Sequence, residues 1–140
     1  MSVLIGSLLL FAVWTLLVLC AGVGIYRWAH VLTGRATVRE WKADERQGSD
    51  WYRRATRAHA NCVENLPVFG AVVVSAVLTG TSHALLDIAA IAVVVARMAQ
   101  STVHFCFVQT EAVAILRFGL FFVQLLAMLF MAALVAVNLV

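Results

Sequence analysis

Long apolar runs alternate with short polar segments along this chain, at intervals that match membrane-spanning helices. A bilayer core needs about 20 predominantly apolar residues per helix. Four segments have that length, at about 3–26, 58–78, 85–107 and 113–139. The pattern predicts an all-α integral membrane protein built as a four-helix bundle. No linker rich in Gly, Ser or Pro divides the sequence, so we expect one domain over residues 1–140.

Composition supports the same class of protein. Hydrophobic residues make up 64% of the chain and charged residues 12%, which lies outside the usual balance of a soluble domain. The first apolar run lacks the basic start of a signal peptide and exceeds the usual length of its apolar region, so we expect a retained span. Three cysteines, at positions 20, 62 and 106, lack metal-binding spacing, and no metal site or disulfide framework is predicted.

The positive charge is concentrated between the first two spans. Eight of the ten Lys and Arg residues lie in the segment 27–57, and the connection 79–84 has none. The positive-inside rule then places this loop in the cytoplasm and both termini on the opposite side of the membrane. Such a local concentration favours contact with lipid headgroups over nucleic-acid binding. We expect part of the loop 37–55 to be helical, with Ser49 or Asp50 capping the second spanning helix.

Polar residues inside the spans form stripes that converge at the cytoplasmic face. Spacings of three, four and three residues bring the polar positions 54–64 of the second span onto one helix face. A second stripe follows the same spacing on the third span, and one arginine stands alone near the start of the fourth. If the spans pack together, these stripes form a cavity suited to an anionic ligand that also carries an amine. The residues are Arg54, Arg57, Asn61 and Glu64; Arg97, Gln100 and His104; and Arg117.

Each of these residues also has a purely structural interpretation. Glu64 and Arg97 are as consistent with a mutual ion pair as with ligand contact, because unpaired charges within a membrane are rare. Asn61 and Gln100 are equally typical of interhelical hydrogen bonding. Arg54 is long enough to reach the lipid headgroups.

The stretch "RATRAHANCVENLPVF" resembles the signature of the MAPEG family, the membrane-associated proteins in eicosanoid and glutathione metabolism. The family pattern is Arg-Ala-His/Gln-x-Asn-x-x-Glu-x-x-Pro, and here it falls on Arg57, Ala58, His59, Asn61, Glu64 and Pro67. The run "ARMAQSTVHFCFVQTEAVAILRFGLFFVQLL" is similar to the family's third and fourth helices, with Arg97 and Arg117 in the expected places. The phrases "QSTVH" and "LRF" resemble its bacterial branch, which implies a bacterial inner membrane.

The resemblance implies a homotrimer that binds glutathione, or another low-molecular-weight thiol, between adjacent subunits near the cytoplasmic side. Arg57, Asn61 and Glu64 would hold the carboxylates, backbone and amino group of the tripeptide, with Arg54, Arg97 and His104 completing the ligand-binding set. Arg117 would be the catalytic residue, because a nearby positive charge favours thiolate over thiol. A lipophilic second substrate would enter from the lipid.

Several positions depart from the pattern of the family's enzymes. Ala60 stands where an arginine is frequent, and His104 or Phe105 and Phe121 stand where tyrosines contact glutathione. Phe118 replaces a serine or threonine. Two functions therefore remain open: a thiol-dependent transferase or peroxidase acting on lipophilic electrophiles or hydroperoxides, and a noncatalytic protein that binds a lipid, a thiol ligand or a partner membrane protein. A bundle whose charges pair internally is a third interpretation.

Overall fold

The computed structural model describes residues 2–41 and 48–139, and every regular element in these ranges is helical. Residues 42–47, on which part of the predicted loop helix falls, lie outside the described ranges. The elements in chain order are α1 (Ser2–Val18), the π-helical turn η1 (Leu19–Gly24), α2 (Ile25–Leu32), the 3₁₀ turn η2 (Val38–Glu40), α3 (Asp50–Leu78), α4 (Ala84–Cys106) and α5 (Glu111–Val137).

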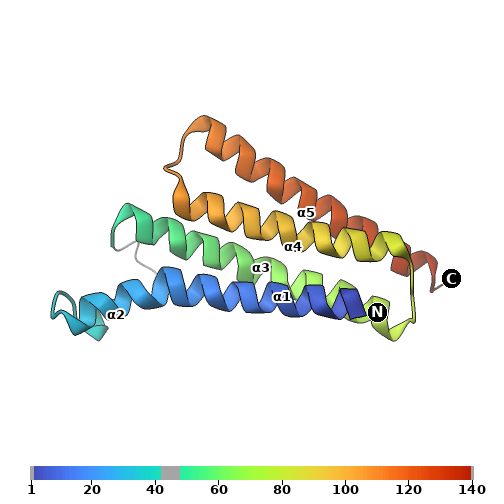
Figure 1. Cartoon of the computed structure of the whole chain (residues 1–140), viewed down its shortest axis with the longest axis horizontal. Coiled ribbons are helices and arrows are strands. Elements are labelled where there is room, and N and C mark those ends of the chain that lie inside the picture. The colour runs from blue at the N-terminus through green and yellow to red at the C-terminus, as the bar shows by residue number, and fades with distance from the viewer. Residues whose placement is uncertain (1, 42–47, 140) are drawn as a thin grey trace.

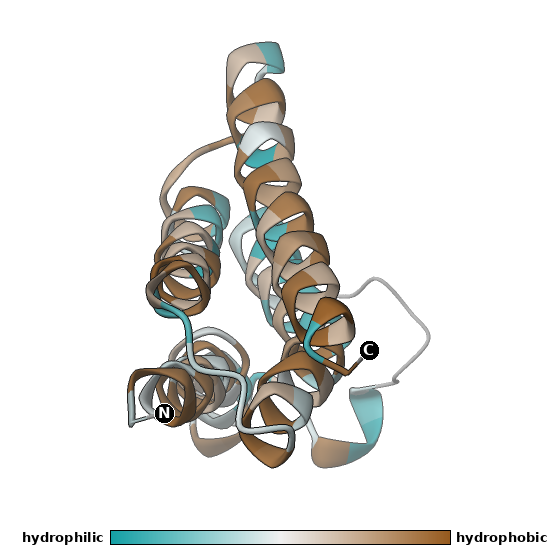
Figure 2. Ribbon diagram, turned by 90° about the vertical axis from the view of Figure 1, so that its right-hand side faces the viewer, coloured by the Kyte–Doolittle hydropathy of each residue, from teal (hydrophilic) through white to brown (hydrophobic). Residues whose placement is uncertain are grey.

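Four helical segments are long and apolar enough to cross a membrane, and the protein is therefore an integral membrane protein. The first runs from Ser2 to Leu32 through α1, η1 and α2, and the other three are α3, α4 and α5. Large hydrophobic side chains are exposed along all four segments, as expected where helices contact lipid. Figure 2 shows hydrophobic colouring along the long helices, interrupted by isolated hydrophilic residues.

Both ends of the predicted loop 27–57 are helical. Helix α2 continues to Leu32, and α3 starts at Asp50, eight positions before the predicted start of the second span. The reason is local: the Ser49 side chain accepts a hydrogen bond from the Tyr52 backbone N–H and caps the helix there. A polar cap, rather than the start of the apolar run, determines where α3 begins.

Helix α4 lies at the centre of the bundle and packs against α1, α3 and α5 (Figure 1). The core contains mostly aliphatic and aromatic side chains, with Phe11 of α1 lying 5.6 Å from Phe69 of α3 between ring centroids. The end of α4 and the starts of α3 and α5 gather at one end of the bundle, on the left of Figure 1, opposite both termini. The polar residues singled out in the sequence lie toward this end.

An aromatic cluster connects α2 to the start of α3. The rings of Tyr26 and Tyr52 stack with centroids 4.5 Å apart, and Trp41 lies 5.5 Å from Tyr52. Arg27 donates through Nε to the Tyr52 hydroxyl at 2.6 Å, and its guanidinium lies 5.5 Å from the centre of the Trp41 ring. This cluster joins the part of the chain before residues 42–47 to the helix that follows them.

Candidate functional site

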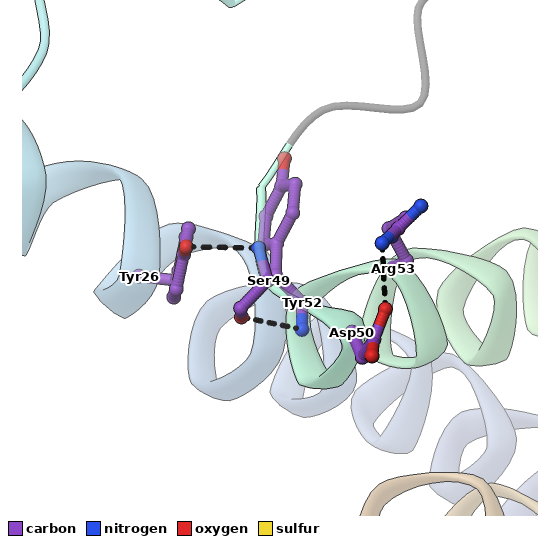
Figure 3. A network of polar contacts seen from close by, with 5 residues as sticks. All are labelled: Tyr26, Ser49, Asp50, Tyr52 and Arg53. Atoms are coloured by element: carbon purple, nitrogen blue, oxygen red, sulfur yellow. Dashed lines mark hydrogen bonds and ion pairs between the residues drawn. The ribbon is translucent and has the colours of Figure 1, made fainter.

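The start of α3 is held by a small polar network (Figure 3). The Ser49 backbone N–H donates to the Tyr26 hydroxyl at 3.1 Å, and the Ser49 hydroxyl accepts from Tyr52 N–H at 3.3 Å. In the first turn, Arg53 pairs with Asp50 at 2.6 Å. The Ser49 contacts fix where α3 begins and connect its first turn to Tyr26.

The polar side chains of α3 lie toward the surface of the bundle. Arg57 and Glu64 are exposed, whereas Arg54 and Asn61 are partly buried. The opposite face packs into the bundle through Tyr52, Ala55, Ala58, Cys62, Phe69, Val73 and Ala76. Glu64 is near the middle of this 29-residue helix, which places an exposed carboxylate deep within a membrane-spanning segment.

The polar side chains of α4 face inward. Arg97, Gln100, Ser101 and His104 are each at most 5% exposed. The predicted cavity between three polar stripes is therefore not formed within the chain: the α4 stripe is enclosed by the bundle, and the α3 stripe lies on its outside.

Two contacts connect α3 to α4 at the level of these stripes. Asn61 Nδ2 lies 3.4 Å from His104 Nε2, and Cys62 Sγ lies 3.4 Å from Ser101 Oγ. Because an amide nitrogen can only donate, the first contact requires Nε2 to accept and places the proton of the neutral ring on Nδ1. That Nδ1 is buried without a hydrogen-bond partner among the described residues. A ligand can reach this N–H only where the surrounding side chains move, because His104 is 2% exposed.

Arg117 lies in the second turn of α5, where its charge acts on the same residues as the charge of Arg57. Both arginines interact electrostatically with His104 and with each other. Arg117 Nη1 donates to Gln109 Oε1 at 3.5 Å, and Gln100 Nε2 donates to the Arg117 carbonyl at 3.0 Å. The structure therefore brings Arg57, Asn61, His104 and Arg117 to one end of the bundle.

Arg97 occupies a different position from the one the sequence indicates. Its guanidinium is 1% exposed and lies 5.7 Å from the centre of the Phe11 ring on α1. Glu64 is near enough for its charge to act on Arg97. No carboxylate in the described ranges, however, lies within 4.0 Å of the Arg97 guanidinium, the distance that defines an ion pair. Within the described part of the chain, the pairing of Glu64 with Arg97 considered from the sequence is therefore not formed.

Sequence reasoning missed one buried polar residue of α5. Gln124 is fully buried, donating to Gln100 Oε1 at 3.1 Å and to the Leu120 carbonyl at 2.8 Å. It is the only amide side chain in the apolar sequence of α5, seven residues and two turns after Arg117. An isolated polar residue in a membrane span was the available signal.

The side chains at this end of the bundle carry charges of both signs. Arg57 and Arg117 provide cationic donors, and Glu64 provides a carboxylate that can accept from an amine. In residues 2–41 and 48–139, no group of three His, Cys, Asp or Glu side chains is placed to hold a metal ion. This donor set fits a zwitterionic ligand with more than one carboxylate.

Comparison with known proteins assigns the fold to a family. No curated protein matches the chain by sequence. A family model described as the MAPEG family matches residues 4–137, which is nearly the whole chain and includes the α3 polar stripe, the α4 stripe and Arg117. The protein therefore belongs to the MAPEG family and is a membrane protein of the kind that serves eicosanoid and glutathione metabolism.

Proposed function

We propose that this protein is a membrane transferase or peroxidase that uses glutathione, or another low-molecular-weight thiol, against lipophilic electrophiles or hydroperoxides. The observation that carries the proposal is the α3 face on which Arg57, Asn61 and Glu64 lie within a membrane span, with both charged side chains exposed. Charges in that position are costly unless they bind something. Family membership supplies the class of ligand.

The residues fit the charges of such a tripeptide. Arg57 and the partly buried Arg54 offer cationic donors for carboxylates, Asn61 offers an amide for the peptide backbone, and Glu64 accepts from the amino group. The unpartnered Nδ1–H of His104 supplies one further donor. Arg97 is enclosed beside Phe11, so in this proposal it acts through its charge rather than by direct contact.

In this proposal Arg117 activates the thiol for the chemical step. A guanidinium near a thiol stabilises the thiolate, which is the nucleophile in thiol transfer. In a transferase step, the thiol proton leaves to solvent, sulfur forms a bond to the electrophilic carbon, and the leaving group departs with its electron pair. Exposed apolar side chains surround Arg117, with Phe118 stacked on Phe122 at 6.4 Å, and this surface fits a substrate that arrives from the lipid.

In this proposal the protein is a homotrimer, as membership of the MAPEG family implies, and the same α3 face supports an assembly of several copies. An exposed carboxylate near the middle of a membrane helix needs a polar partner, and Arg97 does not pair with it within the subunit. A neighbouring copy lying against α3 would cover Glu64 and Arg57 and complete a site between subunits. The mass of the detergent-solubilised complex tests this step: a trimer is expected, and a stable monomer contradicts it.

We also propose that the end of the bundle carrying the site faces the cytoplasm of a bacterial inner membrane, because most of the basic residues lie there. Cys106, exposed at the end of α4, provides a test. In oriented vesicles that contain a variant of the protein without Cys20 and Cys62, a membrane-impermeant thiol reagent should label Cys106 only from the cytoplasmic side.

A noncatalytic binding protein is the second candidate function. It is favoured by Phe118, which is 68% exposed beside Arg117 where the family's enzymes carry a hydroxyl residue. Such a protein would bind the thiol ligand or a lipid without activating sulfur.

Thiolate formation separates the two functions. Glutathione and other thiols would be added to the purified protein, and the thiolate measured by ultraviolet difference absorbance. The transferase proposal predicts a signal that Arg117→Ala lowers strongly without abolishing it and that Glu64→Gln weakens, while Arg53→Ala, which alters an arginine of the same helix paired with Asp50, leaves it unchanged. Binding of a thiol without any thiolate signal would support the noncatalytic function instead.

A further inference from the structure

Amide hydrogen bonds join α4 and α5 at the level of Arg117, although Gln124 Oε1 is buried without a partner among the described residues. Gln124 Nε2 donates both to the Leu120 carbonyl of its own helix, at 2.8 Å, and to Gln100 Oε1 of α4, at 3.1 Å. Gln100 Nε2 in turn donates to the Arg117 carbonyl at 3.0 Å. Gln124 is fully buried and Gln100 is 5% exposed. We call Gln100 and Gln124 together the amide clamp.

The side chain of Arg117 is held much less firmly than its backbone. Its Nη1 reaches only the exposed Gln109, at 3.5 Å, and its Nε is buried without a hydrogen-bond partner among the described residues. The nearby charge of Arg57 repels it. Among the described residues, the bond from Gln100 to the Arg117 carbonyl is therefore the firmest side-chain contact that holds this residue against α4.

The clamp is concentrated at this one level of the α4–α5 contact. In the described part of the chain, the side-chain hydrogen bonds between α4 and α5 are the two that meet at Gln100. Farther along α5, the buried residues Met128, Met131 and Val135 are apolar. Apolar packing of these residues holds the two helices together without polar groups at the level of Arg117. The hydrogen bonds at Gln100 cannot be replaced by water, because water is absent from the membrane core.

We propose that Gln100 and Gln124 are positioning residues, which fix Arg117 where its charge acts on the sulfur of the bound thiol. This inference rests on the proposed function, because the role of Arg117 comes from there. Neither glutamine touches the ligand: each acts through the backbone of α5.

The clamp itself can be observed without any ligand. The sequence contains a single Arg-Phe dipeptide, at 117–118, so protein labelled with ¹³C at arginine carbonyls and ¹⁵N at phenylalanine gives one correlated signal from that peptide bond. Its carbonyl shift reports hydrogen bonding to the Arg117 carbonyl. Gln124→Met, which keeps the length of the side chain and removes the amide, should move this signal. Met131→Leu, a buried apolar exchange on the same helix, should not.

A double-mutant cycle on thiolate formation then separates positioning from adhesion. Gln124→Met should lower the thiolate signal about tenfold, as expected for one interhelical amide bond. In an Arg117→Ala background, the same substitution should have no further effect, because its influence passes through Arg117. Gln124→Asn, which keeps the amide on a side chain one methylene shorter, provides a milder variant if the methionine variant does not fold.

The outcomes distinguish this inference from the proposed function. A shifted carbonyl signal together with a non-additive cycle supports the positioning role. An unmoved carbonyl signal, or effects of Gln124→Met and Arg117→Ala that add, overturns it. If the wild-type protein forms no thiolate with any thiol while the carbonyl signal does shift, the proposed function fails and the clamp is structural only, which also overturns the positioning role.

Discussion

Replacing Gly22 with alanine tests the close approach of η1 to the two helices that carry the site. A Cβ at position 22 would lie 2.8 Å from Phe105 Cε1 and 3.0 Å from Ala55 Cβ. Ala55 is part of the buried face of α3, between Arg54 and Arg57, and Phe105 directly follows His104 on α4. The substitution would therefore displace the Phe105 ring, next to His104, and push η1 away from Ala55 of α3.

The size of the effect follows from comparison with a second glycine. Gly6 lies in α1, where an added Cβ would have no atom within 4 Å, so Gly6→Ala experiences only the gain in helix propensity, about 0.5–1 kcal/mol. Gly22→Ala gains a similar amount but must displace the Phe105 ring and α3. Inserting a methyl group into a packed contact costs about 1–3 kcal/mol. We expect Gly22→Ala to be less stable than Gly6→Ala by that difference.

The free energy of unfolding in mixed micelles, measured by titration with sodium dodecyl sulfate, would provide the comparison. Thiolate formation measured on the same samples should fall for Gly22→Ala and stay unchanged for Gly6→Ala. Equal stability of the two variants would refute the close packing of η1 against α3 and α4, and with it the reason for a glycine at position 22.

Three further predictions follow from the site and its supports. Glu64→Gln should not destabilise the dissociated, ligand-free chain, because breaking a buried ion pair would cost about 3–5 kcal/mol and none is formed with Arg97 within the chain. A loss of detergent stability of that size would contradict this prediction. His104→Gln keeps a polar atom near the position of Nε2 and should weaken thiol binding about 10- to 100-fold in a dialysis assay, whereas His104→Asn keeps a polar atom near Nδ1 and should bind within about tenfold of wild type. The reverse order of affinities would mean that His104 serves only to hold Asn61. Gly48→Ala should destabilise the protein by about 1–3 kcal/mol more than Gly34→Ala, because both glycines have positive φ but only at Gly48 would an added Cβ meet Tyr52, at 2.6 Å. Equal unfolding midpoints of the two variants would refute this prediction.

Much of the fold could be predicted from the sequence because the bilayer constrains it strongly. Four apolar runs of sufficient length specify four helices, since in lipid each backbone polar group must be satisfied within its own segment. The residues at which the helices begin and end could be predicted less well from the sequence. Ser49 caps α3 well before the apolar run begins, and the stacking of Tyr26 on Tyr52, with Arg27 against Trp41, depends on contacts between residues far apart in sequence.

The site could be predicted from the sequence only in part. Spacing alone assigns Arg57, Asn61 and Glu64 to one face of α3. It does not determine whether that face points into the bundle or out of it, because both arrangements share the same periodicity. For Arg97, the outcome depends on Phe11 of α1, a contact that no local pattern indicates.

The central claim is that the polar face of α3 binds a thiol tripeptide. Equilibrium dialysis of labelled glutathione against the purified protein tests it most directly. We predict saturable binding that Glu64→Gln and Asn61→Ala each weaken strongly and that Arg53→Ala leaves intact. Failure of the wild-type protein to bind glutathione or any other low-molecular-weight thiol would contradict the claim, as would binding that neither α3 substitution affects.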